Sequence, residues 1–173
     1  MDLPSAVNAM VEIPRGRVGT FEVDKKTGAM RLDRYLYSSS RDREDYGFIP
    51  QTLAADGDAL DVLVRVSEPM FSGCLIAVHV VDLFRMSERG MHDCKVPGVP
   101  NTDPLFAHIR NLKDDPARFL REAERFFATR SGEARHHQVR HCYAASVSQR
   151  ISRSIVRTNP VPAARWAASS SDV

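Results

Sequence analysis

The stretch Asp56-Gly57-Asp58-Ala59-Leu60-Asp61-Val62-Leu63-Val64 places three carboxylates within six residues and runs directly into an apolar segment. A run of leucine and valine of this length predicts a buried strand. Carboxylates this close repel one another, so all three stay ionised near neutral pH only when a cation lies among them. Hard divalent cations such as Mg2+ and Mn2+ prefer such oxygen ligands. The stretch therefore predicts a metal site at the start of a strand.

Two other interpretations of the acidic stretch are an EF-hand loop and a solvated turn. The EF-hand is excluded, because its sixth position would be Asp61 rather than glycine and its twelfth would be Ser67 rather than glutamate. A solvated Asp-Gly-Asp turn before a strand explains the bare cluster as well as a metal site does. The rest of the sequence has to decide between the turn and the metal site.

Five further segments flank the acidic stretch. In chain order they are VEIPRG (11–16), FEVDK (21–25), LDR (32–34), YGFIPQTL (46–53) and FAHI (106–109). Together with the acidic stretch they resemble, in sequence and in order, the soluble family I inorganic pyrophosphatases, whose signature is Asp-Gly-Asp-Pro-Leu-Asp-Val-Leu-Val. This chain has Ala59 in place of the proline. The resemblance covers about residues 7 to 130, and several spaced motifs in one order are far more specific than one acidic triplet.

Short apolar segments bounded by glycine, proline and polar turns recur along the chain and predict a β-rich fold. The predicted strands are 11–13, 20–24, 29–32, 60–66, 75–81 and 96–99. The polar residues 38–45 predict an exposed loop, and residues 85–95 predict a polar hairpin. Residues 115–129 carry apolar side chains at helical spacing, with Pro116 at the first helical position. We therefore predict a mainly β (α+β) protein, a five-stranded OB-like antiparallel barrel with one packed helix.

The character of the sequence changes near residue 130. Residues 1–130 form the predicted barrel domain, with the helix at 115–129 included in it. Residues 131–173 are rich in Arg, Ser and Ala without sustained periodicity, so we expect a divergent, basic and disordered tail. The tail holds six arginines and two acids, a net charge of +4, so the preceding residues contribute −2 to the total of +2.

Composition excludes several classes of protein. The 173 residues suit one domain, and no apolar stretch is long enough to span a membrane. The N-terminal residues lack the basic and apolar segments of a targeting signal. Cys74, Cys94 and Cys142 are odd in number and form no C-x-x-C pair, which fits reduced thiols better than disulfides or structural zinc. We expect a cytoplasmic protein with neither a membrane nor a nucleic acid as its partner.

The family resemblance implies an enzyme, an inorganic diphosphatase that hydrolyses pyrophosphate to two orthophosphates with several Mg2+ ions per site and acts as a homo-oligomer. Metal ions would neutralise the phosphate oxygens and activate the attacking water. The resemblance makes Asp58 the base that helps to deprotonate this water. The resemblance also implies that the metal ligands are Asp56, Asp61, Asp93 and Glu88, and that the substrate-binding residues are Arg34, Tyr46 and Lys95. It implies that Glu12 and Glu22 bind outer metals or orient water.

Several of these residues have plainer interpretations when each is taken alone. Arg34 directly follows Asp33, and such neighbours more often form a surface ion pair than a phosphate site. Lys95 and Glu12 are then ordinary solvated charges, and Tyr46 is an ordinary core aromatic residue. Only the joint order of the motifs favours the catalytic interpretation.

Departures from the family pattern leave two other hypotheses open. Thr20 stands where the family carries a phosphate-binding lysine, Asp45 stands where an asparagine is usual, and a tyrosine-lysine pair is missing after Arg130. The lost lysine at Thr20 and the missing tyrosine-lysine pair favour a catalytically weakened homologue that serves as a binding or assembly subunit. A nucleic-acid-binding barrel is the third hypothesis, although the basic tail offers only Tyr143 and Trp166 for stacking.

Overall fold

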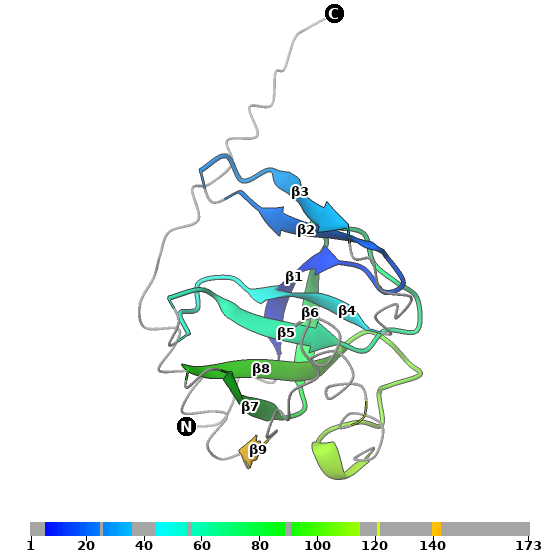
Figure 1. Ribbon diagram of the computed structural model, residues 1–173. Coiled ribbons are helices and arrows are strands. Elements are labelled where there is room, and N and C mark those ends of the chain that lie inside the picture. Colours follow the sequence, from blue (N-terminus) through cyan, green and yellow to red (C-terminus); the bar gives the residue numbers. More distant parts are fainter. Residues whose placement is uncertain are drawn as a thin grey trace, which may run out of the picture.

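The computed structural model describes residues 6–24, 26–35, 44–54, 57–88, 91–114, 121 and 140–142, and for residues 85–88, 91–93, 112 and 140–142 it describes the backbone alone. Strands dominate this part of the chain (Figure 1). The helix predicted for residues 115–129 lies outside the described residues except for Arg121, whose backbone is helical. A short 3-10 turn, η1 (Leu112–Asp114), precedes it. Within the described part, no helix is long and apolar enough to cross a membrane.

Five strands close into a barrel. They are β1 (Val7–Ile13), β4 (Asp45–Ile49), β5 (Leu60–Val64), β6 (Leu75–Val80) and β8 (Met91–Pro100). Neighbours in the order β5-β4-β1-β6-β8 are hydrogen-bonded, and β5 also pairs with β8. The predicted five-stranded barrel is confirmed, and its closure leaves no open edge within the ring.

The pairing that closes the barrel differs from the all-antiparallel prediction. β5 and β8 run parallel, in a register that sets Asp61 beside Lys95 and Val64 beside Gly98, whereas the other barrel pairs are antiparallel. Parallel strands need a long crossover connection, and here it runs through β6 and β7 (Leu83–Glu88). The periodicity of a strand does not encode which distant strand it meets, so this pairing was not visible in the sequence.

Four strands add to the barrel or stand beside it. β2 (Gly19–Val23) and β3 (Met30–Tyr35) form a separate hairpin next to β1, seen at the top of Figure 1. The hairpin turn is held by the Asp24 carboxylate, whose pKa is lowered by hydrogen bonds from the backbone N–H groups of Thr27 and Lys26. β7 extends the sheet beyond β8, as the predicted hairpin at 85–95 requires, and β9 (Arg140–Cys142) pairs with β7. β9 is the part of the expected tail that the structure describes.

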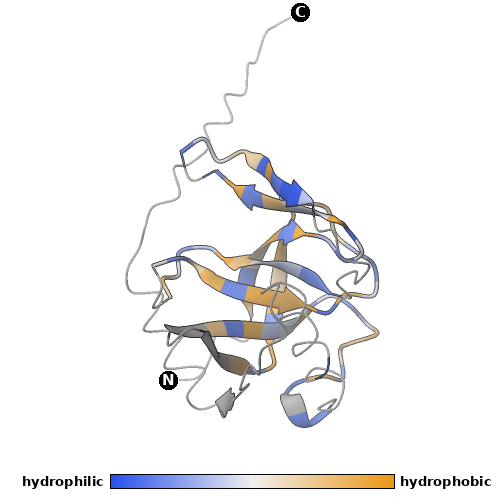
Figure 2. Ribbon diagram, in the orientation of Figure 1, coloured by the Kyte–Doolittle hydropathy of each residue, from blue (hydrophilic) through white to orange (hydrophobic). Residues whose placement is uncertain are grey.

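Strand β5 is buried on both faces, which explains its continuous apolar sequence. Val62 and Val64 point into the barrel interior with Ala9, Val78 and Val96. Leu63 alternates to the outer face and packs in a second apolar cluster. That cluster also contains Ile13, Tyr46, Val81, Phe84, Val99 and Ile109. Figure 2 shows the resulting apolar stretches along the barrel strands. Each fully buried valine or leucine contributes about 1.5–3 kcal/mol, so these two clusters are the main source of stability.

Glycine is required at position 47, where β4 pairs with β1. A Cβ atom built on Gly47 would lie 1.9 Å from the carbonyl oxygen of Met10 and 2.9 Å from the Cα atom of Val11. These are backbone atoms of the paired strand, so a side chain can be fitted only if the two strands separate. Gly47 therefore lets the strand that carries Tyr46 approach β1 closely.

The prediction of an exposed loop at residues 38–45 is wrong for Glu44 and Asp45. Residues 36–43 lie outside the described residues. Asp45 begins β4 and is fully buried, and Glu44 is buried beside it. The two carboxylate oxygens of Asp45 accept hydrogen bonds from the backbone N–H groups of Arg15 and Met70, at 2.7 and 2.8 Å. These hydrogen bonds replace those that the carboxylate would make to water, so Asp45 can be buried. The polar sequence of residues 38–45 was therefore not sufficient to predict exposure.

Candidate active site

Asp61 and Lys95 meet on the outer face of the barrel. They are register partners in the parallel pairing of β5 and β8, and Asp61 shares its face with Leu63, two residues along the strand. The Lys95 Nζ atom contacts Asp61 Oδ2 in an ion pair. The Lys95 side chain is 10% exposed and the Asp61 side chain is 25% exposed. Two residues with different predicted roles, metal binding and phosphate binding, are therefore direct neighbours.

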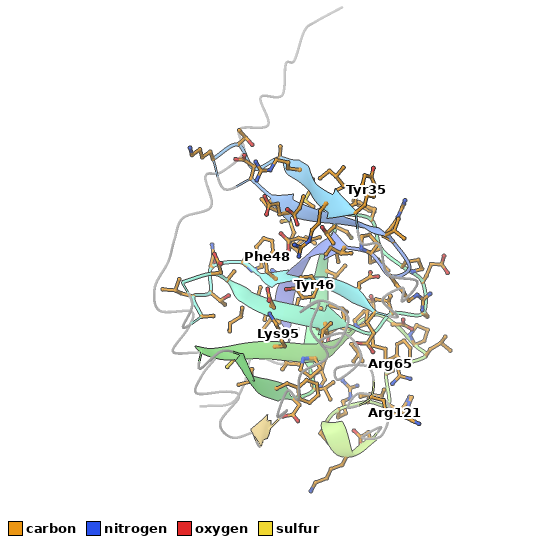
Figure 3. The ribbon with its side chains drawn as sticks, viewed as in Figure 1. Tyr35, Tyr46, Phe48, Arg65, Lys95 and Arg121 are labelled. Atoms are coloured by element: carbon orange, nitrogen blue, oxygen red, sulfur yellow. The ribbon has the colours of Figure 1, made fainter. Side chains whose placement is uncertain are left out.

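Tyr46 lies on the next strand and faces the same ion pair. Its register partner on β5 is Leu63, and the neighbouring pair in the same face joins Phe48 to Asp61. The Lys95 Nζ atom lies 5.9 Å from the centre of the Tyr46 ring, within the range of a cation–π contact. Figure 3 shows Phe48, Tyr46 and Lys95 in this part of the barrel. Tyr46 is a buried core residue, as its plainer interpretation expected, and it also borders the candidate site.

Arg34 lies on the β2–β3 hairpin, where it forms the ion pair with Asp33 that its plainer interpretation predicted. Arg34 Nε is 3.5 Å from Asp33 Oδ2, and the arginine side chain is 64% exposed. An exposed pair of this kind contributes little to stability. The guanidinium therefore remains accessible to an anion in solution.

Thr20 is buried opposite Arg34 on the hairpin. Its hydroxyl lies 3.2 Å from Asp33 Oδ2 and 3.1 Å from the backbone oxygen of Arg34. A bulge between Thr20 and Phe21 shifts the register of the strand pair at this point. Asp33 was not among the predicted site residues, although its position between Leu32 and Arg34 in a matched motif was a signal. The hydroxyl of Thr20 thus binds the neighbour of Arg34 in the place expected for a lysine.

The two glutamates expected to orient metal-bound water have protein partners on the hairpin. Glu12 on β1 accepts a hydrogen bond from the backbone N–H of Val23, with 3.1 Å between Val23 N and Glu12 Oε1. Glu22 on β2 forms an ion pair with its cross-strand neighbour Arg31, and this hydrogen bond raises the pKa of the guanidinium. Glu12 therefore joins the hairpin to the barrel, while Glu22 lies on the hairpin surface.

The acidic stretch is described in part. Gly57 adopts a left-handed backbone with φ of 92°, and the backbone oxygen of Asp58 accepts a hydrogen bond from Ala54 at 2.6 Å. Asp56 lies outside the described residues, and of Glu88 and Asp93 only the backbones on β7 and β8 are described. Among the described side chains no three potential ligands converge. The predicted ligand set therefore stays a prediction.

The donor chemistry of the predicted ligand set nevertheless fits a hard divalent cation. Every predicted ligand is a carboxylate, which is the ligand that Mg2+ prefers. Asp61 already holds a cation, because the ammonium of Lys95 contacts its Oδ2 atom. Asp93 occupies a position two residues before Lys95 on β8, the strand paired with Asp61. The Lys95 ammonium thus shows that this position attracts positive charge.

Asp45 anchors the start of the strand that carries Tyr46, and it was not predicted as a supporting residue. It directly precedes Tyr46 and joins β4 to the loops that contain Arg15 and Met70. Burial raises its pKa above the ordinary value, against the opposing effect of these two hydrogen bonds. Arg15 extends the connection, since its guanidinium donates to the backbone oxygens of Val66 and Ser67, both at 2.9 Å. The sequence signal was an aspartate at a position where the family resemblance predicts asparagine.

Comparison with known proteins identifies the family. A family model described as "Inorganic pyrophosphatase" matches residues 9–158, which is most of the chain and extends beyond the boundary predicted at residue 130. The chain belongs to the inorganic pyrophosphatase family. The family predicted from the acidic stretch and its flanking segments is thereby confirmed.

Relatives within the inorganic pyrophosphatase family agree in sequence and in fold. An inorganic pyrophosphatase from Nostoc sp. is 43% identical over 124 residues, which cover 72% of this chain and 73% of that protein. A soluble inorganic pyrophosphatase from Oryza sativa is also 43% identical over 124 residues, but the match spans only 58% of its length. The crystal structure of inorganic pyrophosphatase from Thermus thermophilus superposes with a TM-score of 0.77 at 34% identity, covering 88% of this chain and 90% of that chain. The barrel is thus the fold of the family.

Proposed function

We propose that this protein hydrolyses inorganic pyrophosphate to two orthophosphates and that it requires Mg2+. The observation that carries the proposal is the placement of Asp61, Lys95 and Tyr46 on one face of a barrel whose sequence belongs to the inorganic pyrophosphatase family. A carboxylate, an ammonium and a phenol are the groups that bind a metal ion and a phosphate side by side. Family membership supplies the substrate class, and the site supplies the chemical groups.

The metal ligands in this proposal are Asp56, Asp61, Asp93 and Glu88, with Glu12 and Glu22 binding outer ions or their water. Bound Mg2+ would neutralise the charge on pyrophosphate and lower the pKa of the attacking water. Asp58 accepts the proton of that water. Asp58 directly follows the left-handed Gly57, and in the sequence it lies two residues after the proposed ligand Asp56.

Three residues hold the substrate in this proposal. Lys95 and Arg34 donate charge-assisted hydrogen bonds to phosphate oxygens, and Tyr46 donates through its hydroxyl. The position of Lys95 is set by the β5–β8 register, whereas Arg34 is an exposed residue of the β2–β3 hairpin that pairs with Asp33. Asp45, Gly47 and their contacts keep Tyr46 at its place on β4.

A weakened homologue is the second candidate, and Thr20 favours it. A lysine there would add a positive charge, but the threonine hydroxyl contacts Asp33 and the backbone oxygen of Arg34. A charge-assisted hydrogen bond contributes roughly 1.5–3 kcal/mol, so the loss of one lowers the rate by about tenfold to a hundredfold. The candidate predicts a protein that binds Mg2+ and pyrophosphate but turns over slowly.

Release of orthophosphate from pyrophosphate separates these candidates. The purified full chain is assayed with Mg2+, with excess chelator, and with Mg2+ restored after chelation. Hydrolysis that stops with chelator and returns with Mg2+ supports the enzyme. Calorimetric binding of Mg2+ and pyrophosphate without phosphate release above background supports the weakened homologue and contradicts catalysis.

We further infer a cytoplasmic homo-oligomer. Cys74 is a free thiol in the part of the chain that the structure describes, which suits a reducing compartment. Three large apolar side chains of the hairpin region are exposed, Val18 by 43%, Leu32 by 42% and Tyr35 by 61%. Exposed apolar groups of this kind favour a subunit contact. Light scattering coupled to size-exclusion chromatography tests this, and a mass of 19.4 kDa would contradict it.

A further inference from the structure

We infer that Lys95 exchanges partners during binding: it neutralises Asp61 in the absence of metal, and it turns to the phosphate when metal and substrate bind. The exchange would couple the two binding events, so that each strengthens the other. This inference rests on the proposed function, because it takes Asp61 as a metal ligand and a phosphate as the second partner of Lys95. It concerns the order and the strength of binding, which the proposed reaction leaves open.

The geometry of the pair makes Lys95 the natural counterion of Asp61. Adjacent strands of a sheet are separated by about 4.8 Å, and the β5–β8 register places these two residues directly beside one another. The Nζ atom contacts Asp61 Oδ2, and both side chains are largely shielded from water. A shielded carboxylate without a partner is strongly unfavourable. Lys95 therefore supplies the positive charge that Asp61 requires when no metal is bound.

A metal ion cannot simply be added to this arrangement. The ammonium occupies an Asp61 oxygen, and it would lie a few ångströms from any divalent cation bound to the same carboxylate. Like charges at such distances repel strongly where water is largely excluded. Metal binding therefore has to displace the ammonium from Asp61, and Lys95 lowers the affinity of the site for metal.

A bound phosphate removes this obstacle. The side chain of lysine ends in a compact charge on a flexible four-carbon stem, so it can change partners without a change in the backbone. The Tyr46 ring, 5.9 Å from Nζ, gives the ammonium a second favourable neighbour during the exchange. When a phosphate oxygen accepts a hydrogen bond from the Lys95 ammonium, the ammonium leaves Asp61, and the carboxylate can then bind the metal. By linkage, metal binding must then strengthen phosphate binding by the same factor.

Mn2+ binding to the full-length protein, followed by electron paramagnetic resonance without any turnover, tests the exchange. Methylenediphosphonate, a non-hydrolysable diphosphonate, replaces pyrophosphate. In Lys95→Met, Mn2+ affinity without the diphosphonate should rise about tenfold, and the gain that the diphosphonate causes in the unmodified protein should shrink by a similar factor. Lys95→Arg keeps the charge and should retain the low affinity for Mn2+ by itself.

Arg34→Met is the matched control, because Arg34 carries the same charge and the same proposed role but pairs with Asp33 instead of Asp61. It should weaken diphosphonate binding and leave Mn2+ affinity without diphosphonate unchanged. Circular dichroism with chelator checks that each variant is folded. If Lys95→Met misfolds, Lys95→Gln is used in its place, since it also removes the charge.

The outcomes separate this inference from the proposed reaction. Unchanged or weaker Mn2+ binding by a folded Lys95→Met or Lys95→Gln protein overturns the exchange, even if the unmodified protein hydrolyses pyrophosphate. Absence of Mn2+ binding in all the variants overturns it as well. A tenfold gain in Mn2+ affinity supports the exchange even if no orthophosphate is released, and in that case only the proposed reaction fails.

Discussion

The hydroxyl of Thr20 on β2 lies 3.2 Å from the Asp33 carboxylate on β3, and the same carboxylate pairs with Arg34. A polar contact between threonine and aspartate thus occupies the position at which the family resemblance predicts a lysine. The hydroxyl adds no charge to the site. The contact also keeps Asp33, and through it Arg34, in place on the hairpin.

Thr20→Lys should lower the KM for pyrophosphate, because it adds a positive charge next to Arg34. The effect should be no more than about tenfold, since Asp33 competes for the new ammonium and part of the roughly 1.5–3 kcal/mol of a charge-assisted bond is lost. Steady-state kinetics at saturating Mg2+ measures it. Thr20→Val is the control, because it removes the hydroxyl without adding a charge and should not lower KM. A KM that is equal in Thr20→Lys and the unmodified protein would show that this position does not face the substrate.

Asp45→Asn should change the pH dependence of stability. Burial raises the pKa of Asp45 above its ordinary value of 3.8, so the folded state binds this proton more tightly than the unfolded chain. Asp45 therefore stabilises the fold most at low pH and loses this contribution as pH rises from about 3.8 through the raised pKa. Asparagine has one acceptor oxygen for two N–H donors, but it carries no charge to bury.

Urea unfolding of both proteins between about pH 4 and pH 7 measures the effect. The free energy of unfolding of the unmodified protein, minus that of Asp45→Asn, should fall as pH increases, because all other titrating groups are shared. A difference that stays constant, or one that rises with pH, would mean that the pKa of Asp45 is not raised in the folded protein.

Gly47→Ala should destabilise the barrel severely. The new methyl group would lie 1.9 Å from the carbonyl oxygen of Met10, so β1 and β4 would have to separate along the strand that carries Tyr46. Overpacking of a core typically costs about 1–3 kcal/mol, and a clash with backbone should reach at least the upper end. Gly19→Ala is the control, because its methyl group would contact Leu32 Cδ1 at 3.4 Å. Equal free energies of unfolding for the two variants would contradict the close approach of β1 and β4.

The C-terminal segment should contribute to the fold through β9 and little beyond it. Truncation after residue 150 keeps Arg140–Cys142 and their pairing with β7, whereas truncation after residue 139 removes them. The shorter protein should lose more than about 5 °C in Tm, and the longer one less than about 2 °C. Differential scanning calorimetry compares the two. A large loss of Tm in the longer protein would show that residues 151–173 pack against the barrel and are not a disordered tail.

Local patterns in the sequence predicted the strands better than their partners. The apolar run from Leu60 to Val64 predicted a buried strand, and the structure confirms it with both faces covered. Its parallel partner β8 was not predicted, because a register such as Asp61 beside Lys95 depends on closure of the whole barrel. Asp45 was assigned to an exposed loop, since only the fold supplies the backbone donors of Arg15 and Met70 that allow its burial.

The candidate site was predictable as a set of residues but not as a set of contacts. The order of the motifs brought Asp61, Lys95 and Tyr46 into one proposal, and the structure places them together. Nothing in the motifs predicted that the metal ligand Asp61 would pair with the phosphate ligand Lys95. Asp61 and Lys95 are 34 residues apart in the sequence and meet only because their strands pair. The ion pair therefore becomes visible only in the structure.

The central claim is that Asp61 belongs to a metal site that hydrolyses pyrophosphate. The most direct test is the rate of Mg2+-dependent orthophosphate release by Asp61→Asn, with Glu68→Gln as a matched acid-to-amide control at an exposed position. Circular dichroism must first show that both variants are folded. We predict that Asp61→Asn lowers kcat at least about 100-fold, equivalent to roughly 2.7 kcal/mol, while Glu68→Gln keeps the rate of the unmodified protein. Full Mg2+-dependent activity of a folded Asp61→Asn protein would contradict the claim.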